Sequence, residues 1–248
     1  MNSYMSNKTY NTEGLVLRTR DYKENSKLVT LLSPDRGKIS ALVKGVNKPK
    51  SKMQSVIQPF VYGWFQLYAG RSLHTITQGR VYNHFSLLRT ELNILYNGYY
   101  ILETLEKIAI EEENKGLFVL GLSSLHLLEA LDDYKVVVPF FQIKALKNMG
   151  LTPHIDGCMN GHTLSENKVY FDLTEGGIVC KNCANYSENI IKLSKGTYRV
   201  LLFLLKAYPA KLKKIKLSLT QFQELCLLHN NFLEIQLGIK IKSKKFLV

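Results

Sequence analysis

Length, composition and charge limit the kinds of protein that this chain can form. The 248 residues include 46% hydrophobic side chains, enough to fill the cores of two modest domains, and carry a formal net charge of +13. No run approaches the roughly 18 apolar residues of a membrane span, and the N-terminal MNSYMSNKTYNTEG lacks the apolar segment of a secretory signal. These features argue against a membrane protein and a secreted protein, and we expect a cytoplasmic one.

The positive charge is unevenly distributed along the chain. Residues 1–90 hold 14 Lys and Arg against 4 Asp and Glu, residues 91–188 hold 7 against 14, and residues 189–248 hold 12 against 2. Between Arg36 and Thr90 there are nine basic residues and no acidic one. Because mixed charges would serve solubility equally well, this imbalance indicates a polyanionic partner.

The first 82 residues alternate β-rich runs with turn signals. Five strands are predicted, within residues 14–20, 27–33, 37–46, 59–69 and 72–82. The sequences PDRG at 34–37 and AGRS at 69–72 are typical of hairpin turns, whereas residues 46–58 are long enough for an open loop. Five short antiparallel strands rich in β-branched and aromatic residues favour a small barrel of the oligonucleotide-binding (OB) type.

Helical periodicity replaces the strand pattern after Phe85. Leucine and isoleucine recur at intervals of three, four and seven over residues 86–113, which predicts one long helix with an interruption near Gly98. Further helices are predicted at 117–131, at 139–149, at 195–207 and at 221–237, the last beginning after Thr220 and ending at Gly238. The expected fold is therefore α+β, with an OB barrel at 1–83 and a helical domain at 84–248.

The segment KGVNKPKSK at 44–52 combines four lysines on one loop. A charge run is often only a solvated surface, but this one lies in an acid-free stretch of a predicted barrel. Basic loops that follow phosphates, together with aromatic faces, are typical of OB domains that bind nucleic acids. The candidate nucleic-acid ligands are Arg36, Lys38, Lys44, Lys48, Lys50, Lys52 and Arg71.

Aromatic residues accompany these lysines in the run PFVYGWFQLY. They are Tyr62, Trp64, Phe65 and Tyr68. Alternate members of a strand must fill the barrel core, so the sequence does not identify any one of them as a residue that stacks on bases. A second basic region is a further candidate, either for another DNA strand or for the acidic tail of a partner protein. Its residues are Lys206, Lys211, Lys213 and Lys214.

Three of the four cysteines lie within 26 residues of one another, in an insert at about 151–186. Cys180 and Cys183 form a Cys-x-x-Cys pair, which is typical of one half of a zinc site. Cys158 is followed four residues later by His162, and we expect these two residues to supply the other half, with His154 as the alternative imidazole. Four protein ligands would make the zinc structural, because no position remains for an activated water. The competing interpretation is a metal-free loop.

The sequence lacks the common catalytic motifs. There is no phosphate-binding loop ending in Gly-Lys-Ser/Thr, no Gly-x-Ser-x-Gly and no His-Glu-x-x-His. We therefore do not expect an enzyme.

Several segments, in order, resemble the RecO family of bacterial DNA repair proteins. They are TEGLVLRTRDYKENSKLVT, SPDRGKISALVKGVNKPKSK, MGLTPHIDGC, YFDLTEGGIVCKNC and LGIKIKSKKFL. The resemblance spans nearly the whole chain and implies an OB barrel joined to a helical domain with a zinc-ribbon-like insert. It places the basic loop of the family on Lys44, Lys48, Lys50 and Lys52. Gly161 stands where the family pattern has a second cysteine. This departure weakens the expectation of a zinc site but not the expectation of the fold.

The resemblance also implies a function in recombination. Members of the family bind single- and double-stranded DNA, anneal complementary strands and engage the acidic tail of single-stranded-DNA-binding protein (SSB). With RecR they load the RecA recombinase, which implies a nucleoid-associated protein. Three alternatives stay open at this point: an RNA-binding OB module, a zinc-dependent nuclease, and a scaffold that binds only acidic protein tails.

Overall fold

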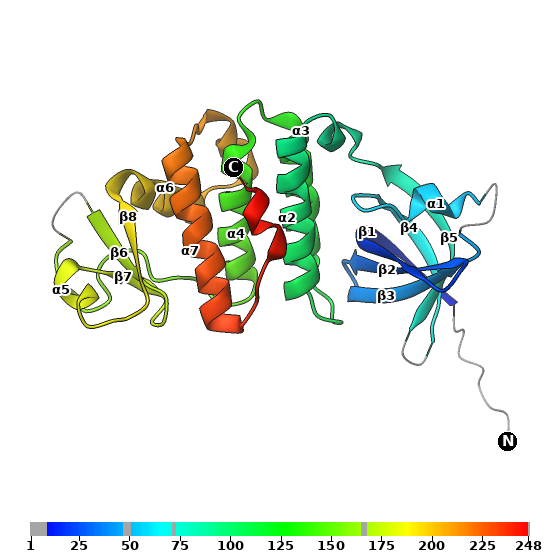
Figure 1. Cartoon of the computed structure of the whole chain (residues 1–248), viewed down its shortest axis with the longest axis horizontal. Helices are drawn as coiled ribbons and strands as arrows, with labels where there is room; N and C mark the ends of the chain where they lie inside the picture. The colour runs from blue at the N-terminus through cyan, green and yellow to red at the C-terminus, as the bar shows by residue number, and fades with distance from the viewer. Residues whose placement is uncertain (1–8, 47–50, 71–72, 165–167, 248) are drawn as a thin grey trace, which may run out of the picture. The chain divides into compact units, whose positions relative to one another are not determined.

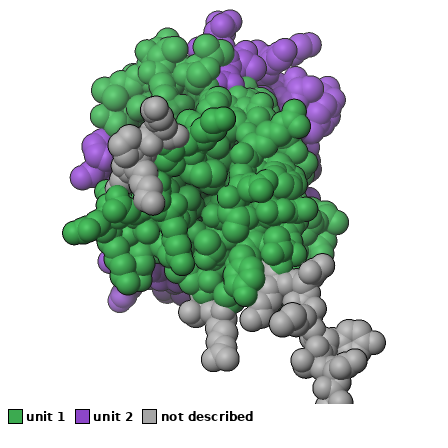
Figure 2. All heavy atoms as spheres, turned by 90° about the vertical axis from the view of Figure 1, so that its right-hand side faces the viewer, with its two compact units in different colours: residues 1–126 green, residues 127–248 purple. Residues whose placement is uncertain are grey.

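The computed structural model describes residues 9–46, 51–70, 73–164 and 168–247 (Figure 1). The chain forms two compact units, residues 1–126 and residues 127–248 (Figure 2). Within the described ranges, no helix has both the length and the apolar character that a membrane span requires.

Five strands of the first unit close into a barrel, as the sequence predicts. They are β1 (Thr9–Tyr22), β2 (Ser26–Ser33), β3 (Gly37–Lys44), β4 (Tyr62–Tyr68) and β5 (His74–Asn83). The strand order is β1-β2-β3-β5-β4, and β4 returns to pair with β1. Inward residues alternate along each strand with outward ones, so that Val29, Leu31 and Phe65 are fully buried in the barrel core.

Two details of the barrel differ from the prediction. The strands are not all antiparallel, because β3 and β5 pair in parallel where the barrel closes. The predicted open loop at 46–58 contains a short helix, α1 (Met53–Val56), which packs against β5. The hairpin turn at 34–37 is confirmed, whereas the turn at 69–72 includes residues outside the described ranges.

The long helix predicted at 86–113 is wrong in its extent. A 3₁₀ turn, η1 (Ser86–Arg89), precedes the helix α2 (Leu92–Ile108), and α3 (Lys115–Ala130) follows. Gly98 does not interrupt α2. A Cβ atom at Gly98 would lie only 2.8 Å from the ring of Phe60, so this glycine permits close packing of α2 against the barrel.

The second unit combines helices with a small sheet. Its longer helices are α4 (Val137–Asn148), α6 (Lys195–Lys206) and α7 (Leu219–Leu237), and its short helices are η2 (Tyr134–Val136), α5 (Lys181–Ala184), η3 (Pro209–Lys214) and η4 (Lys242–Phe246). α4 is buried on nearly all sides and packs against α6 and α7. α7 begins after Ser218 rather than Thr220, because Ser218 and Gln221 form a reciprocal capping box there.

The cysteine insert carries a three-stranded sheet of order β7-β6-β8. The strands are β6 (Lys168–Asp172), β7 (Gly177–Val179) and β8 (Ile190–Ser194). β8 lies beyond the end of the predicted insert at 186 and was not expected from the sequence. It pairs antiparallel with β6 and leads directly into α6, so the insert is continuous with the helical part of its unit.

Candidate nucleic-acid interface and metal centre

A groove of about 340 Å³ lies on the outer surface of the barrel. Outward side chains of β1, β2 and β3 form its floor, and α2 contributes one edge. The lining residues are Arg18, Arg20, Leu28, Thr30, Lys38, Ser40, Glu106 and Lys107. Four basic side chains and two hydroxyls thus surround a single carboxylate, a composition that suits an anionic ligand.

The charges in this groove are only partly compensated. Arg18 forms an ion pair with Glu106 at 3.3 Å, and the Nζ atom of Lys38 donates to the main-chain oxygen of Glu106 at 3.2 Å. Across the described part of the chain, no ion pair engages Arg20 or Lys107, both of which are exposed. These two side chains are therefore available to bind phosphate oxygens.

Of the predicted nucleic-acid ligands that the structure describes, only Lys38 lines the groove. Lys44 ends β3 and Lys52 precedes α1, and both side chains are exposed. Arg36 lies over the ring of Tyr10 at 4.1 Å, in a cation–π contact at the β2–β3 turn. The three others, Lys48, Lys50 and Arg71, lie outside the described residues.

Sequence reasoning missed Arg18, Arg20 and Lys107. A signal for the two arginines was present, because residues two apart in the strand GLVLRTR project from the same face. Lys107 could not be found in this way. It belongs to α2, and only the packing of α2 on β1 and β2 brings it to the groove.

The second basic region belongs to the end of α6 and to η3. Its four predicted residues, Lys206, Lys211, Lys213 and Lys214, are all exposed. Lys213 alone of them lines a neighbouring pocket of about 470 Å³, which Asp132, Asp133 and Lys216 also line. Its two carboxylates balance its two lysines, whereas the groove on the barrel has four basic side chains for one carboxylate.

The candidate metal centre is assembled from three short segments of the insert. Cys180 follows β7 directly and caps α5, and Cys183 lies within α5. Cys158 is held beside β7, because the next residue, Met159, donates its N–H to the carbonyl of Ile178 at 2.9 Å. The turn after Cys158 contains Gly161 at a φ of +72°, a conformation that suits glycine and returns the chain toward the two other cysteines.

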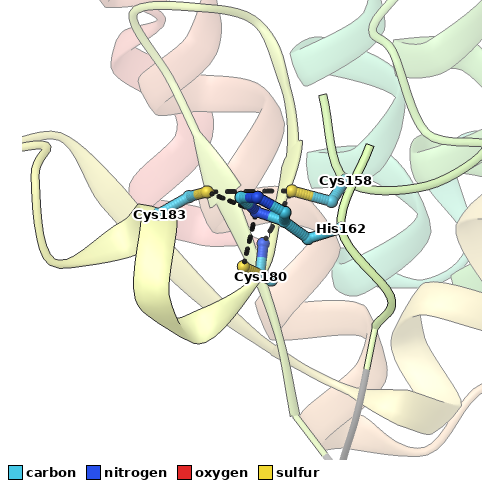
Figure 3. Close-up of side chains that lie close together, drawn as sticks. All are labelled: Cys158, His162, Cys180 and Cys183. Atoms are coloured by element: carbon cyan, nitrogen blue, oxygen red, sulfur yellow. Dashed lines mark hydrogen bonds between the residues drawn. The ribbon is translucent and has the colours of Figure 1, made fainter. Parts of the chain in front are cut away.

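Four potential ligands converge at this point (Figure 3). The ligand atoms of Cys158, His162, Cys180 and Cys183 all lie within 4.8 Å of one another. The Nδ1 atom of His162 lies 3.2 Å from the Sγ of Cys183, whose distance to the Sγ of Cys158 is 4.0 Å. Tetrahedral zinc with bonds of about 2.3 Å to sulfur would hold its ligand atoms roughly 3.8 Å apart, so the observed spacing fits such an ion.

The surroundings of Cys158 favour its thiolate. Burial opposes ionisation of the thiol, but backbone N–H groups of Cys180, Asn160 and His162 point at the sulfur and lower the pKa of Cys158 to about 7. The side-chain amide of Asn160 also donates to the Sγ of Cys183 at 3.2 Å. Thiolates held by such donors are the form that binds metal ions. The four residues are therefore able to hold a metal ion.

The alternative imidazole, His154, is not part of this cluster. Its backbone bridges to β7, where the His154 N–H donates to the Gly176 carbonyl and the His154 carbonyl accepts from Ile178. The structure thus selects His162 between the two histidines that the sequence left open.

Comparison with known proteins gives matches along nearly the whole chain. The family model described as "Recombination protein O N terminal" matches residues 5–85, and the model described as "Recombination protein O C terminal" matches residues 89–245. A DNA repair protein RecO of Desulforamulus reducens is 35% identical over 242 residues, covering 97% of this chain and 94% of that protein. The protein of the same name in Bacillus pumilus is 30% identical over 237 residues, covering 95% and 92%.

Proposed function

The chain belongs to the RecO family of DNA repair proteins, and from this premise we propose that it is a recombination mediator that binds single- and double-stranded DNA and anneals complementary strands. Membership of this family places the chain in DNA repair and recombination. In the proposal, the protein also acts with RecR to load RecA onto single strands covered by SSB. The matched relatives are named for DNA repair and not for a catalytic activity.

The groove on the barrel is the observation that carries this proposal. Arg18, Arg20, Lys38 and Lys107 come from three different elements and line one surface, with Glu106 as the single acid among the lining residues. A groove of this charge suits a sugar–phosphate backbone. Lys44 and Lys52, with the other basic residues predicted for the loop at 44–52, would extend the positive surface beyond the groove.

Annealing requires two polyanionic strands to approach each other closely. Lys and Arg side chains neutralise phosphates and release the counterions that surround them, which removes much of the repulsion between the strands. The exposed lysines of α6 and η3 are the candidate second site, for another strand or for the acidic tail of SSB. Such a protein would act in the cytoplasm, at the nucleoid.

We assign a structural role to the metal centre, with zinc as its ion. Cys158, Cys180, Cys183 and His162 would hold it, three thiolates and one imidazole being a ligand set that zinc favours. The ion would cross-link the segment before β6 to the segment after β7. Because all four ligands come from the protein, this centre supports no hydrolytic role.

A strand-annealing assay with complementary labelled oligonucleotides tests the proposal directly. We expect the purified protein to raise the annealing rate, and expect the replacement of Arg20 and Lys107 by Ala to reduce this effect. Competition with structured RNA distinguishes a DNA mediator from an RNA-binding module. Unchanged annealing rates with and without the protein would refute the proposal.

A further inference from the structure

The outer face of β4 carries large aromatic side chains that the barrel core does not need. Along this strand Gly63, Phe65 and Leu67 point inward and are buried, whereas Trp64 and Tyr68 point outward. Trp64 is partly exposed, and Tyr68 keeps 43% of its surface exposed. Large aromatic side chains at the surface are more informative than scattered aliphatic ones, and β4 presents two of them on its outer face.

The neighbouring strand β5 widens this face with polar and aromatic side chains. On β5, Arg80 lies opposite Trp64 and Gln78 lies opposite Gln66. Tyr82, also on β5, is 49% exposed, and its ring centroid lies 5.3 Å from that of Tyr62. We name the outward side chains of these two strands the aromatic face: Tyr62, Trp64, Gln66, Tyr68, Gln78, Arg80 and Tyr82.

The charge of this face indicates the kind of ligand. β4 and β5 contain no acidic residue, and Arg80 is exposed beside Trp64. Glu13 on β1 lies opposite Trp64 on its other side, and the Oε2 of Glu13 accepts a hydrogen bond from the hydroxyl of Tyr62 at 2.8 Å. Planar apolar rings beside a guanidinium suit a ligand that is both flat and anionic.

β1 connects the aromatic face with the groove. Its first half, from Thr9 to Leu15, pairs with β4, and its second half, from Val16 to Tyr22, pairs with β2. The groove residues Arg18 and Arg20 therefore lie on the strand that borders the aromatic face. Between these two sites, residues 14–17 of β1 are buried, so a strand of nucleic acid reaches both sites only by passing over the segments that cover them.

We propose that the aromatic face stacks on the unpaired bases of single-stranded DNA, with Trp64 and Tyr68 as the stacking side chains. This inference rests on the proposed DNA-binding function and adds to it a preference for single strands. Every base offers a π-face, so such stacking is independent of sequence, and it is denied to the paired bases inside a duplex. The groove, in contrast, contacts phosphates that both forms of DNA share.

Trp64 is the single tryptophan of the chain and reports on this contact without any label. The unmodified protein is titrated with an oligothymidylate of about 20 nucleotides, a length that spans the site of an OB domain. Binding is followed separately by the anisotropy of a dye on the DNA. We expect tryptophan fluorescence to be quenched in parallel with binding, and expect an abasic strand of equal length to bind with little quenching.

Substitutions give a second, independent readout. Trp64→Leu keeps an apolar side chain but removes the stacking surface, and we expect it to weaken single-strand binding about tenfold and leave duplex binding unchanged. Trp64→Phe is expected to keep most of the affinity. Tyr186→Leu, at a 92% exposed tyrosine of the other unit, is the matched control and should change neither affinity.

The outcomes separate this inference from the proposed function. Anisotropy that reports binding of oligothymidylate without a change in tryptophan fluorescence overturns the stacking contact and leaves the DNA-binding function intact. Equal loss of single-strand and duplex affinity in Trp64→Leu also overturns it, because the residue would then act through the phosphates or the fold. Failure of the protein to bind any DNA overturns both.

Discussion

The backbone N–H of Lys38 donates a 2.7 Å hydrogen bond to the carbonyl of Ile110. This bond joins the start of β3 to the segment between α2 and α3, and Asn114 makes a similar bond to Pro34 at 3.2 Å. The β2–β3 hairpin is thereby fixed against the helices of its own unit. Lys38, a residue of the groove, is thus positioned by its main chain as well as by its side chain.

Gly37 makes this contact sterically demanding. Its φ is +60°, and a Cβ atom there would lie 2.2 Å from the carbonyl oxygens of Ile110 and Glu112. We predict that Gly37→Ala destabilises the protein by about 2 kcal/mol or more, because backbone atoms must move and the conformation is strained. Urea unfolding measures the change. Gly157→Ala, where a Cβ would meet nothing within 4 Å, is the control and should cost little; an equally small effect at Gly37 contradicts the prediction.

The groove predicts how binding depends on salt. For single strands the slope of log affinity against log salt is about −0.7 per phosphate contacted, so about five contacts would give roughly −3 to −4. Arg20→Ala should weaken binding of every sequence and make the slope shallower by about 0.7. Lys195→Ala, an exposed lysine in the other unit, is the control. Affinity that does not change between low and high salt would exclude binding through phosphates.

The basic loop at 44–52 predicts a further loss of affinity. Replacement of its four lysines by Ala (Lys44, Lys48, Lys50 and Lys52) should weaken DNA binding and leave the unfolding transition unchanged, since Lys44 and Lys52 are exposed and form no ion pair within the described residues. Anisotropy titrations and thermal unfolding measure the two quantities. A variant that binds DNA as tightly as the original chain would remove this loop from the binding site.

The metal centre predicts different behaviour for its two candidate histidines. Mutation of a group that only orients a metal ligand lowers the metal affinity about 10- to 100-fold. Because His162→Ala removes a ligand itself, it should lower the metal affinity at least about 100-fold. His154→Ala should have little effect, since that side chain lies outside the cluster. Metal analysis and competition with a coloured chelator measure both. Equal zinc affinity in the two variants would exclude His162 as a ligand.

His229 predicts a loss of stability in acid. The side chain is buried in α7, its Nδ1–H donates to the carbonyl of Leu225 at 2.7 Å, and burial lowers its pKa from 6.5 to about 4. In the unfolded chain the imidazole of His229 binds a proton below pH 6.5, but in the folded chain it does so only below about pH 4. Stability is therefore highest above pH 6.5 and falls through this window.

The size of this effect is measurable by urea unfolding. Between pH 7 and pH 5 the linkage amounts to about 2 kcal/mol. His229→Leu removes the titrating group. Between pH 7 and pH 5, the free energy of unfolding of this variant should therefore decrease by about 2 kcal/mol less than that of the original chain. Parallel pH profiles for the two proteins would show that His229 does not cause the loss.

Local patterns in the sequence were sufficient for much of this fold. Alternation of apolar residues predicts the strands of the barrel, because side chains in a strand project to opposite faces in turn. The spacing of Cys158, Cys180 and Cys183 indicates the metal centre, because a Cys-x-x-Cys turn brings two thiolates to one ion. The helices at 117–131, 139–149 and 195–207 were also predicted to within about two residues, since their amphipathic periods are local.

The sequence by itself determined the five strands of the barrel, most of the longer helices, the cysteines that can ligate a metal, and the basic character of the N-terminal part of the chain. Only the tertiary structure decided that Arg20 of β1, Lys38 of β3 and Lys107 of α2 line one groove, that β3 and β5 close the barrel in parallel, and that His162 joins the cysteines. The physical reason is that periodicity and spacing act over a few neighbouring residues, whereas these three arrangements depend on packing between segments far apart in the chain.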